Sequence, residues 1–145
     1  MALTVRRAGP GDEGTVAELI RELARSEEEE SGITAAYAAS WLISPGVAAL
    51  LAEEDGRAVG LLSYSVRPNL YHAADSVLIE ELVVRAGTRG RGVGGALMAD
   101  LLRSAAEAGC AEVSVSTMPD NARAIAFYRK HGFVDEALFL ERHLG

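Results

Sequence analysis

The sequence contains a single cysteine, Cys110, and no long hydrophobic run. One thiol cannot form an internal disulfide, and no second cysteine or histidine lies close enough in sequence to suggest a zinc site. None of the apolar segments approaches the roughly 20 residues that a membrane-spanning helix requires. Because residues 1–6 resemble a strand rather than a signal peptide, we expect a cytoplasmic protein without a disulfide, a metal or a membrane partner. Cys110 is expected to be a small buried residue that opens a strand.

Basic residues are also in deficit. Lysine and arginine number 14 against 21 aspartate and glutamate residues, so the formal net charge is −7. A surface of this sign argues against nucleic acid as a partner. It would attract a cationic small molecule, although a similar excess of carboxylates is also common for solubility alone.

What the sequence does have is enough apolar material for a core. Hydrophobic residues make up 49% and charged residues 24% of the 145 positions, which is ordinary for a globular protein. No repeat, linker or low-complexity segment divides the chain. We therefore expect one domain that spans residues 1–145.

Hydrophobic periodicity predicts four helices and six strands. The predicted helices run from about residue 13 to Arg25, from Ile33 to Ile43, from Gly92 to Ala108, and from Asp120 or Asn121 to His131. The predicted strands are Leu3–Arg7, Val47–Ala52, Ala58–Val66, Val77–Arg85, Val113–Thr117 and Phe133–Leu140. The order β-α-α-β-β-β-α-β-α-β is that of a mixed α/β domain with a partly antiparallel, partly parallel sheet.

The most informative segment joins the fourth predicted strand to the third predicted helix. It consists of Arg89, Gly90, Arg91, Gly92, Val93, Gly94 and Gly95. Glycines let the backbone approach a ligand closely, and the first turn of a helix leaves N–H donors without partners. The helix dipole and two guanidinium groups favour negative charge at this point. We therefore expect a phosphate or pyrophosphate ligand, since a purely structural turn would not need both arginines.

The residues from Gly90 to Gly95 also fit the dinucleotide fingerprint G-x-G-x-x-G. The context argues against that interpretation. A dinucleotide-binding unit carries the fingerprint after its first strand and an acidic residue at the end of the next strand, whereas here Glu112 precedes that strand's core and Ser116-Thr117 end it. A nucleoside-triphosphate loop is excluded because no Gly-Lys-Ser/Thr follows.

Two motifs resemble those of the GNAT acetyltransferase family. Arg89-x-x-Gly92-x-Gly94 matches the family pattern Q/R-x-x-G-x-G/A, and Asn121 to Phe133 matches N-x-x-A-x-x-F-Y-x-x-x-G-F. The order of predicted elements agrees with the family over essentially the whole chain. The resemblance therefore implies the acyl-CoA N-acyltransferase fold and acetyl-CoA as co-substrate, with no metal.

The resemblance also implies roles for particular residues. The pantetheine arm would pair with the backbone of Leu82, Val83 and Val84, and an N–H near Leu82 or Val83 would stabilise the oxyanion. The amides from Gly90 to Gly95 would hold the pyrophosphate, and Asn121 would contact the cofactor arm. In the diamine-acetyltransferase subgroup, a glutamate at the position of Glu80 serves the active site.

The two candidate catalytic residues are Glu80 as the base and Tyr128 as the acid that protonates the departing thiolate. Each also has a structural interpretation, as a hydrogen-bonded carboxylate and as a packed ring. Strict alternation puts Glu80 and Glu81 on opposite faces, so that only one can face the cleft. The resemblance selects Glu80, whereas a bulge would favour Glu81.

A base is needed because the acceptor amine is mostly protonated. A lysine-like amine with a pKa near 10.4 is neutral in only about one molecule in 2,500 at pH 7, a handicap of roughly 4.6 kcal/mol. A carboxylate can accept that proton directly or through a water. We also considered Cys110 as an acylated nucleophile, and direct transfer is favoured because Cys110 opens its strand at the end away from the cleft.

We therefore expect an N-acetyltransferase that acts on a primary amine of a small molecule, and the resemblance implies a homodimer. Two alternatives remain open: a protein or peptide N-acetyltransferase, and a catalytically silent acyl-CoA-binding sensor. The acidic run Glu27–Glu30 would either line the path of a cationic substrate or form a solvated helix end. Arg67, Tyr71 and His72 would either form a substrate wall or be ordinary loop residues.

Overall fold

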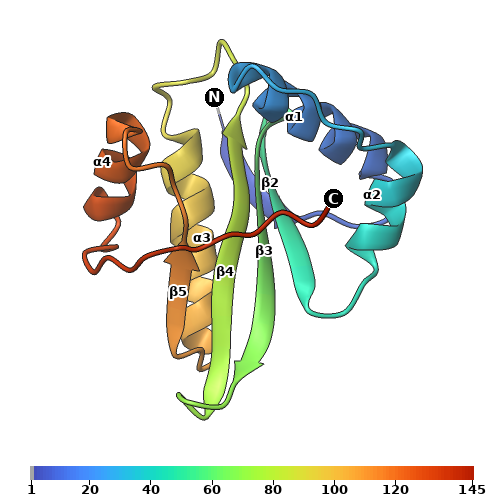
Figure 1. The fold of residues 1–145 in the computed structure, drawn as a ribbon. Coiled ribbons are helices and arrows are strands. Elements are labelled where there is room, and N and C mark those ends of the chain that lie inside the picture. The colour runs from blue at the N-terminus through green and yellow to red at the C-terminus, as the bar shows by residue number, and fades with distance from the viewer. Residues whose placement is uncertain (1) are drawn as a thin grey trace.

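The computed structural model describes residues 2–145, which form a five-stranded sheet and four helices. The strands lie in sequential order across the sheet. They are β1 (Leu3–Arg7), β2 (Val47–Glu54), β3 (Arg57–Asn69), β4 (Ala74–Val84) and β5 (Glu112–Val115). Neighbours from β1 to β4 are antiparallel, and β5 is parallel to β4 (Figure 1).

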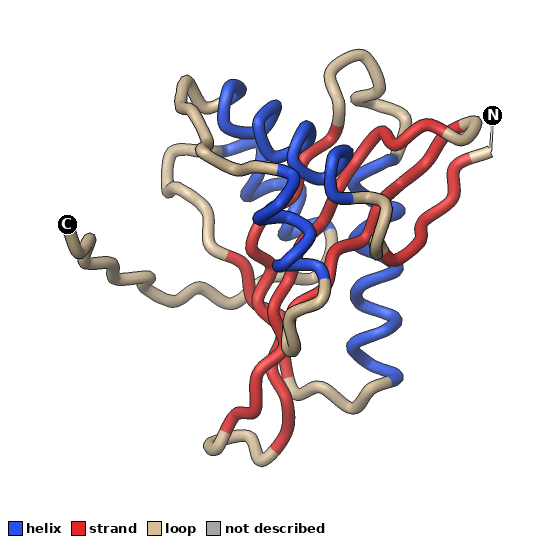
Figure 2. Tube along the Cα trace, turned by 90° about the vertical axis from the view of Figure 1, so that its right-hand side faces the viewer, coloured by secondary structure: helices blue, strands red, loops and turns tan. Residues whose placement is uncertain are grey.

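The helices cover both faces of this sheet (Figure 1). Helices α1 (Glu13–Ser26) and α2 (Ala35–Leu42) pack on one face, α3 (Val93–Glu107) packs on the other, and α4 (Ala122–Lys130) follows β5 beside α3. The ends follow ordinary capping rules: the Thr34 side chain accepts a hydrogen bond from the Tyr37 N–H at the start of α2. Figure 2 shows the layers edge-on.

The core consists of two apolar clusters, one on each face of the sheet. Strand β2 supplies both, because Leu50 and Ala52 face α3 while Ala49 and Leu51 face α1 and α2. This two-sided burial explains why β2 is a continuous apolar run in the sequence rather than an alternating one. The fully buried large side chains of α3 are Val93, Leu97, Met98 and Leu101.

Most predicted elements are confirmed within a few residues, and the mixed α/β class is confirmed. The expected loop Arg67–Asp75 is shorter, because β3 and β4 continue as a hairpin to Asn69 and from Ala74. The predicted strand Phe133–Leu140 is wrong for this structure. Residues 133–145 have no regular secondary structure and extend away from the domain (Figure 2). They lie against no neighbouring strand, and a strand needs a partner for its backbone hydrogen bonds.

Strands β3 and β4 lose register at one point. Tyr64 pairs with Ile79 and Ser63 with Glu81, so Glu80 is an extra residue on β4. This β-bulge interrupts the alternation of β4. The side chains of β4 that face α3 are Ile79 before the bulge and Leu82 after it, with two residues between them instead of one.

Gly60 in β3 allows α3 to approach the sheet. A Cβ atom at this position would lie 2.6 Å from Val93 Cγ1 and 3.1 Å from Leu97 Cδ1. We expect Gly60→Ala to lower the free energy of unfolding by about 1–3 kcal/mol, measured by urea denaturation, because neither side chain can move without disturbing a packed core.

The matched control is Gly14→Ala in α1, where nothing lies within 4 Å of the new Cβ. This change should leave stability unchanged or raise it by up to about 1 kcal/mol, because alanine favours a helix over glycine. Equal effects of the two substitutions would refute the close-packing argument.

Candidate active site

The glycine-rich turn forms the N-terminal end of α3. Gly92 is the N-cap in the left-handed conformation with φ 79°, and Gly90 has φ 84°. No atom lies within 4 Å of where a Cβ would project at either glycine. The first α-helical backbone bond runs from the Ala96 N–H to the Gly92 carbonyl, so the N–H groups that precede Ala96 have no partner within the helix. These amides and the helix dipole form an anion-binding end.

The two arginines of this turn differ. Arg91 Nη1 lies 2.6 Å from Glu54 Oε1, which ties the turn to the end of β2. Arg89 is exposed and makes no ion pair with any of residues 2–145. Arg91 therefore has a structural contact, whereas Arg89 has none of this kind within the described part of the chain. The expectation that both arginines serve only a ligand thus no longer holds for Arg91.

Strand β4 has a neighbour on both sides only as far as Ile79. Its pairing with β5 covers Ser76–Ile79, whereas its pairing with β3 continues to Val84. The Arg85 N–H donates to the Val59 carbonyl on the β3 side at 2.8 Å. Because N–H directions alternate along a strand, those of Leu82 and Val84 point to the opposite, open edge.

The open edge and the end of α3 are adjacent, because β4 ends at Val84 and the glycine-rich turn follows directly. An extended molecule can therefore form backbone hydrogen bonds along Leu82 to Val84 while its anionic part meets the amides of α3. Val83 is buried toward α1 and α2, so its side chain does not occupy this edge. The arrangement fits an acyl-CoA, with its pantetheine arm and pyrophosphate.

Helix α4 contributes the residues of the second motif. Asn121 caps the helix, since its Oδ1 accepts a hydrogen bond from the Ala124 N–H at 3.1 Å. The Tyr128 ring packs edge-on against Phe127 and Phe133, with centroid distances of 5.4 and 5.8 Å. Burial raises the pKa of the Tyr128 phenol. Both residues thus have structural contacts alongside the roles that the motif implies.

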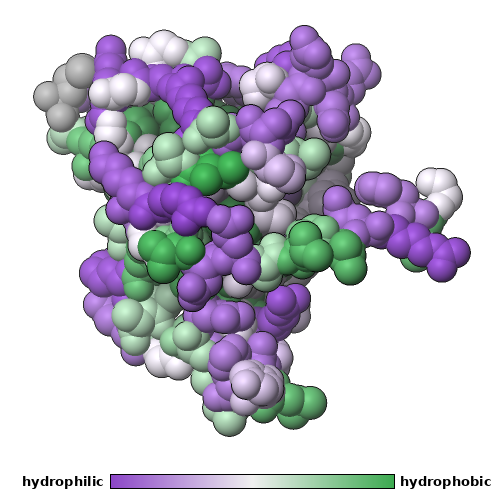
Figure 3. Space-filling model, turned by 60° about the vertical axis from the view of Figure 1, so that its left-hand side comes forward, coloured by the Kyte–Doolittle hydropathy of each residue, from purple (hydrophilic) through white to green (hydrophobic). Residues whose placement is uncertain are grey.

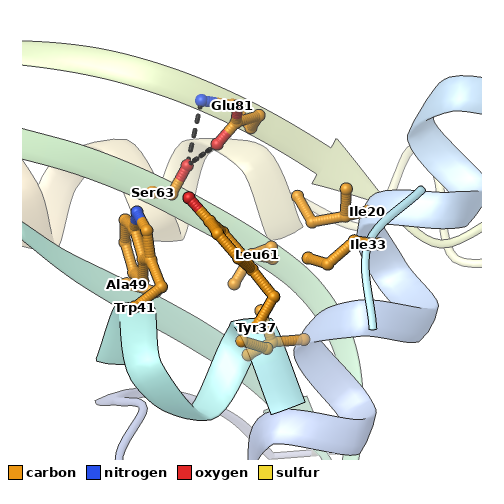
Figure 4. A pocket seen from close by; sticks show the side chains of 10 residues that line it. Ile20, Ile33, Tyr37, Trp41, Ala49, Leu61, Ser63 and Glu81 are labelled. Atoms are coloured by element: carbon orange, nitrogen blue, oxygen red, sulfur yellow. Dashed lines mark hydrogen bonds between the residues drawn. The ribbon is translucent and has the colours of Figure 1, made fainter. Parts of the chain in front are cut away.

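A pocket opens on the opposite face of the sheet, beneath α1 and α2 (Figure 4). Its volume is about 200 Å³. The lining residues are Val16, Ile20, Ile33, Tyr37, Ala38, Trp41, Ala49, Leu61, Ser63 and Glu81. Helices α1 and α2 supply much of its wall, whereas the Arg67–Asp75 segment, which includes the expected wall residues Arg67, Tyr71 and His72, does not contribute.

The bulge brings both glutamates of β4 to this face. The Ser63 hydroxyl donates to Glu81 Oε1, and the Glu81 N–H donates to Ser63 Oγ at 3.1 Å. Ser65 Oγ donates to Glu80 Oε2 at 3.0 Å. Because Ser63 and Ser65 are two residues apart on β3, their side chains share a face. The expectation that only one glutamate can face this side is therefore wrong: Glu81 lines the pocket, and Glu80 lies beside it, exposed.

An ion-pair network that sequence reasoning missed connects α1 to the end of β4. Arg85 Nη1 lies 2.6 Å from Glu18 Oε1, and its Nε donates to the Ala58 carbonyl. The Glu22 carboxylate accepts a hydrogen bond from the Ala86 N–H at 2.9 Å. Glu18 and Glu22 are four residues apart on the α1 helix, but nothing in the sequence indicates which strand they would meet.

Other singled-out residues lie away from the pocket. The acidic run Glu27–Glu30 is exposed after α1. Tyr71 and His72 are at the tip of the β3–β4 hairpin, where His72 Nε2 lies 3.5 Å from Glu112 Oε2. Cys110 is half-buried just before β5, at the end opposite the point where β4 and β5 separate. Across residues 2–145, no cluster of three His, Cys, Asp or Glu side chains is arranged to hold a metal ion. No helix there is long and apolar enough to cross a bilayer.

Beyond Ile79, strand β4 has a strand neighbour on one side only, and its open edge lies next to the N-terminal end of α3. This combination is typical of acyl-CoA-dependent acyltransferases. Residues 16–133 match the Acetyltransferase (GNAT) family. The chain belongs to this family and is an acetyl-CoA-dependent N-acetyltransferase, as the two motifs predict.

Three similar proteins illustrate the relationship. Aminoalkylphosphonate N-acetyltransferase of Salmonella typhimurium is 33% identical over 129 residues, covering 89% of this chain and 83% of that protein. L-2,4-diaminobutyric acid acetyltransferase of Nocardia farcinica is 33% identical over 115 residues, covering 79% of this chain and 58% of that protein. The crystal structure of an aminoglycoside acetyltransferase from an uncultured soil metagenomic sample has a TM-score of 0.84 and 25% identity, with both chains fully covered.

Gly92 allows a test of the anion-binding end. Gly92→Ala forces a side chain into the left-handed region, at a cost of roughly 1–2 kcal/mol, and puts a methyl group beside the free amides. We expect the affinity for coenzyme A, measured by calorimetry, to fall at least tenfold.

The control is Gly109→Ala at the other end of α3. Its φ is 77°, and its surroundings are equally open. Gly109→Ala should lower the free energy of unfolding by a similar amount without changing the affinity for coenzyme A. A similar loss of affinity in both variants would mean that helix stability, rather than local access, limits binding.

Proposed function

We propose that the protein transfers the acetyl group of acetyl-CoA to a primary amine of a small molecule. The observation that carries this proposal is the presence of two sites on one strand. The open edge of β4 lies beyond its last pair with β5, while Glu81 of the same strand lines a separate pocket under α1 and α2. Two substrates could thus meet at β4 from different directions. The names of the similar proteins, which refer to aminoalkylphosphonate, diaminobutyric acid and aminoglycosides, support a small amine.

The acetyl-CoA site would run from the turn to the open edge. The amides of Gly90 to Gly95, including Val93, would bind the pyrophosphate, with Arg89 and Arg91 nearby. The arm would pair with Leu82 to Val84, and Asn121 would contact it. The direction of the Leu82 N–H supports that amide as the donor to the thioester carbonyl oxygen, where negative charge develops during attack.

The reaction would be a direct attack. The neutral amine nitrogen forms a bond to the acetyl carbon, the C–S bond breaks, and the thiolate leaves. Glu80 would accept, through a water, the proton that the ammonium loses to become the neutral amine, and Glu81 would hold the amine in the pocket. The nitrogen would release its second proton to water as the C–S bond breaks. Tyr128 would protonate the thiolate, a role that its place in the second motif supports, since the phenol is protonated at neutral pH even at its ordinary pKa.

Substitution of the glutamates separates their roles. We expect Glu80→Gln to lower kcat about 100-fold with little change in the amine KM, because general-base catalysis contributes at least that factor. Glu81→Gln should mainly raise the amine KM. Both kinetic constants are measured from the rate of thiol release. In the same assay, Tyr128→Phe should lower kcat. Glu107→Gln, on the exposed end of α3, is the control.

A loss of kcat only in Glu81→Gln would move the base to Glu81. Coenzyme A binding without turnover in the wild-type protein, for amines and peptides alike, would instead support the sensor. Faster turnover of a peptide N-terminus than of any small amine would support the protein-modifying alternative.

We infer further that two copies associate through the C-terminal segment, residues 133–145. Leu138, Leu140 and Leu144 are 86–89% exposed there, and Figure 3 shows apolar side chains on this projecting segment. The outer edge of β5 has no strand neighbour in the described sheet. An alternating apolar segment from a second copy would pair with such an edge. A cytoplasmic location is also proposed, supported by the lone Cys110.

Light scattering tests this association. We expect the wild-type protein to have the mass of a dimer, and the double substitution Leu138→Lys and Leu140→Lys to give a monomer, because charged side chains cannot be buried in the interface. Leu70→Lys, at the exposed hairpin tip, should remain dimeric. A monomeric wild-type protein would refute the proposal.

A further inference from the structure

The pocket under α1 and α2 is apolar almost throughout. Eight of its ten lining residues are aliphatic or aromatic, and only Ser63 and Glu81 are not. A second hollow of about 330 Å³ shares Ile20, Ile33 and Tyr37 with it. The two hollows therefore adjoin at these three residues, and the second one is also lined by Ser31 and Gly32. A molecule in the first pocket would contact mostly carbon, with Ser63 and Glu81 as the polar residues at its inner end.

The inner end is suited to an ammonium group. Ser63 holds one oxygen of the Glu81 carboxylate in place, which leaves the other free to accept a hydrogen bond. In Figure 4, Tyr37 and Trp41 extend from α2 toward this pair, with the Tyr37 oxygen and the Trp41 nitrogen at their leading ends. The Glu81 carboxylate supplies a full negative charge, and the Tyr37 hydroxyl oxygen can accept a further hydrogen bond. Glu80 lies next along the same strand and increases the negative potential.

The same environment disfavours an anion. No lysine or arginine is among the residues that line the pocket. Arg21 is near the mouth, where its guanidinium already donates to the Ile33 carbonyl at 3.0 Å. A carboxylate or phosphonate next to the amine would therefore lie against apolar walls and two glutamates, without a cationic partner to compensate its desolvation.

We infer that the acceptor is a primary monoamine with an alkyl or aralkyl body and no anionic group beside the amine. This inference rests on the proposed acetyl transfer and narrows its substrate class. The acceptors in the names of the two 33% identical proteins, an aminoalkylphosphonate and diaminobutyric acid, each carry an anionic group. The pocket thus indicates a specificity different from theirs.

Three amines test the inference in the wild-type enzyme with acetyl-CoA. Phenethylamine and phenylalanine differ only by a carboxylate, and 2-aminoethylphosphonate lacks the apolar body. We expect kcat/KM for phenethylamine to exceed both others at least tenfold in thiol release. The difference in basicity works against this expectation, because the amine of phenylalanine is less basic than that of phenethylamine and is more often neutral at a given pH. Equal or faster turnover of phenylalanine or the phosphonate overturns the inference.

Binding can be measured without turnover. Trp41 is the only tryptophan in the chain and lines the pocket, so its fluorescence reports occupancy directly. Phenethylamine should change the fluorescence at concentrations at least tenfold below those of phenylalanine. This result together with an absence of thiol release would refute acetyl transfer but support the pocket's preference. An absence of response to all three amines would overturn the inference.

A charge introduced at the pocket provides a second test. Ile33→Arg adds a cation to the wall, and we expect it to reduce the preference for phenethylamine over phenylalanine at least fivefold. Ile43→Arg, which is exposed and outside the pocket, is the matched control and should leave the preference unchanged. Equal preferences in Ile33→Arg and the wild-type enzyme would mean that the wall does not determine selectivity, contrary to the inference. Should Ile33→Arg fail to fold, the three-amine comparison alone decides.

Discussion

The site depends on the fact that β4 is a fully paired strand for only part of its length. Up to Ile79 it lies between β3 and β5, and beyond that residue only β3 accompanies it. The bulge at Glu80 occurs where this change takes place. Backbone groups left without a strand partner must find another one or remain in water. The end of the β4–β5 pairing leaves an edge open to an extended ligand, and the bulge at the same point brings two carboxylates to the face that carries α1 and α2.

The rest of the fold holds this irregular strand in place. Gly60 lets α3 lie close to the sheet, and Gly94 lets α4 approach α3, since a Cβ there would be 3.3 Å from the Phe127 ring. On the other face, Arg85 and Ala86 are bound by the Glu18 and Glu22 side chains of α1. Helix α1, which bounds the pocket, is thus anchored to the segment that leads into the glycine-rich turn.

Sequence reasoning reached the fold and the glycine-rich turn at the start of α3 because both rest on local signals. Glycines at required positive φ and a helical apolar period can be read from neighbouring residues. The register between β3 and β4 cannot, because a bulge is fixed by pairing between residues almost twenty positions apart. Alternation therefore misplaced Glu81 relative to Glu80. The strand prediction for Phe133–Leu140 failed for a related reason. The alternating pattern of this segment predicts a strand but does not specify the strand with which it would pair.

The two faces of the sheet can change independently, and this bears on specificity. The phosphate end and the open edge are built by β4, α3 and backbone amides, whereas the pocket is built by side chains of α1, α2 and the inner strands. A substitution usually leaves backbone amides in place, whereas it changes the side chains that form the wall of the pocket. Relatives at 33% identity can therefore keep the same co-substrate while accepting different amines. In this chain, the pocket has a mostly apolar wall, and Glu81 has no lysine or arginine among the other lining residues.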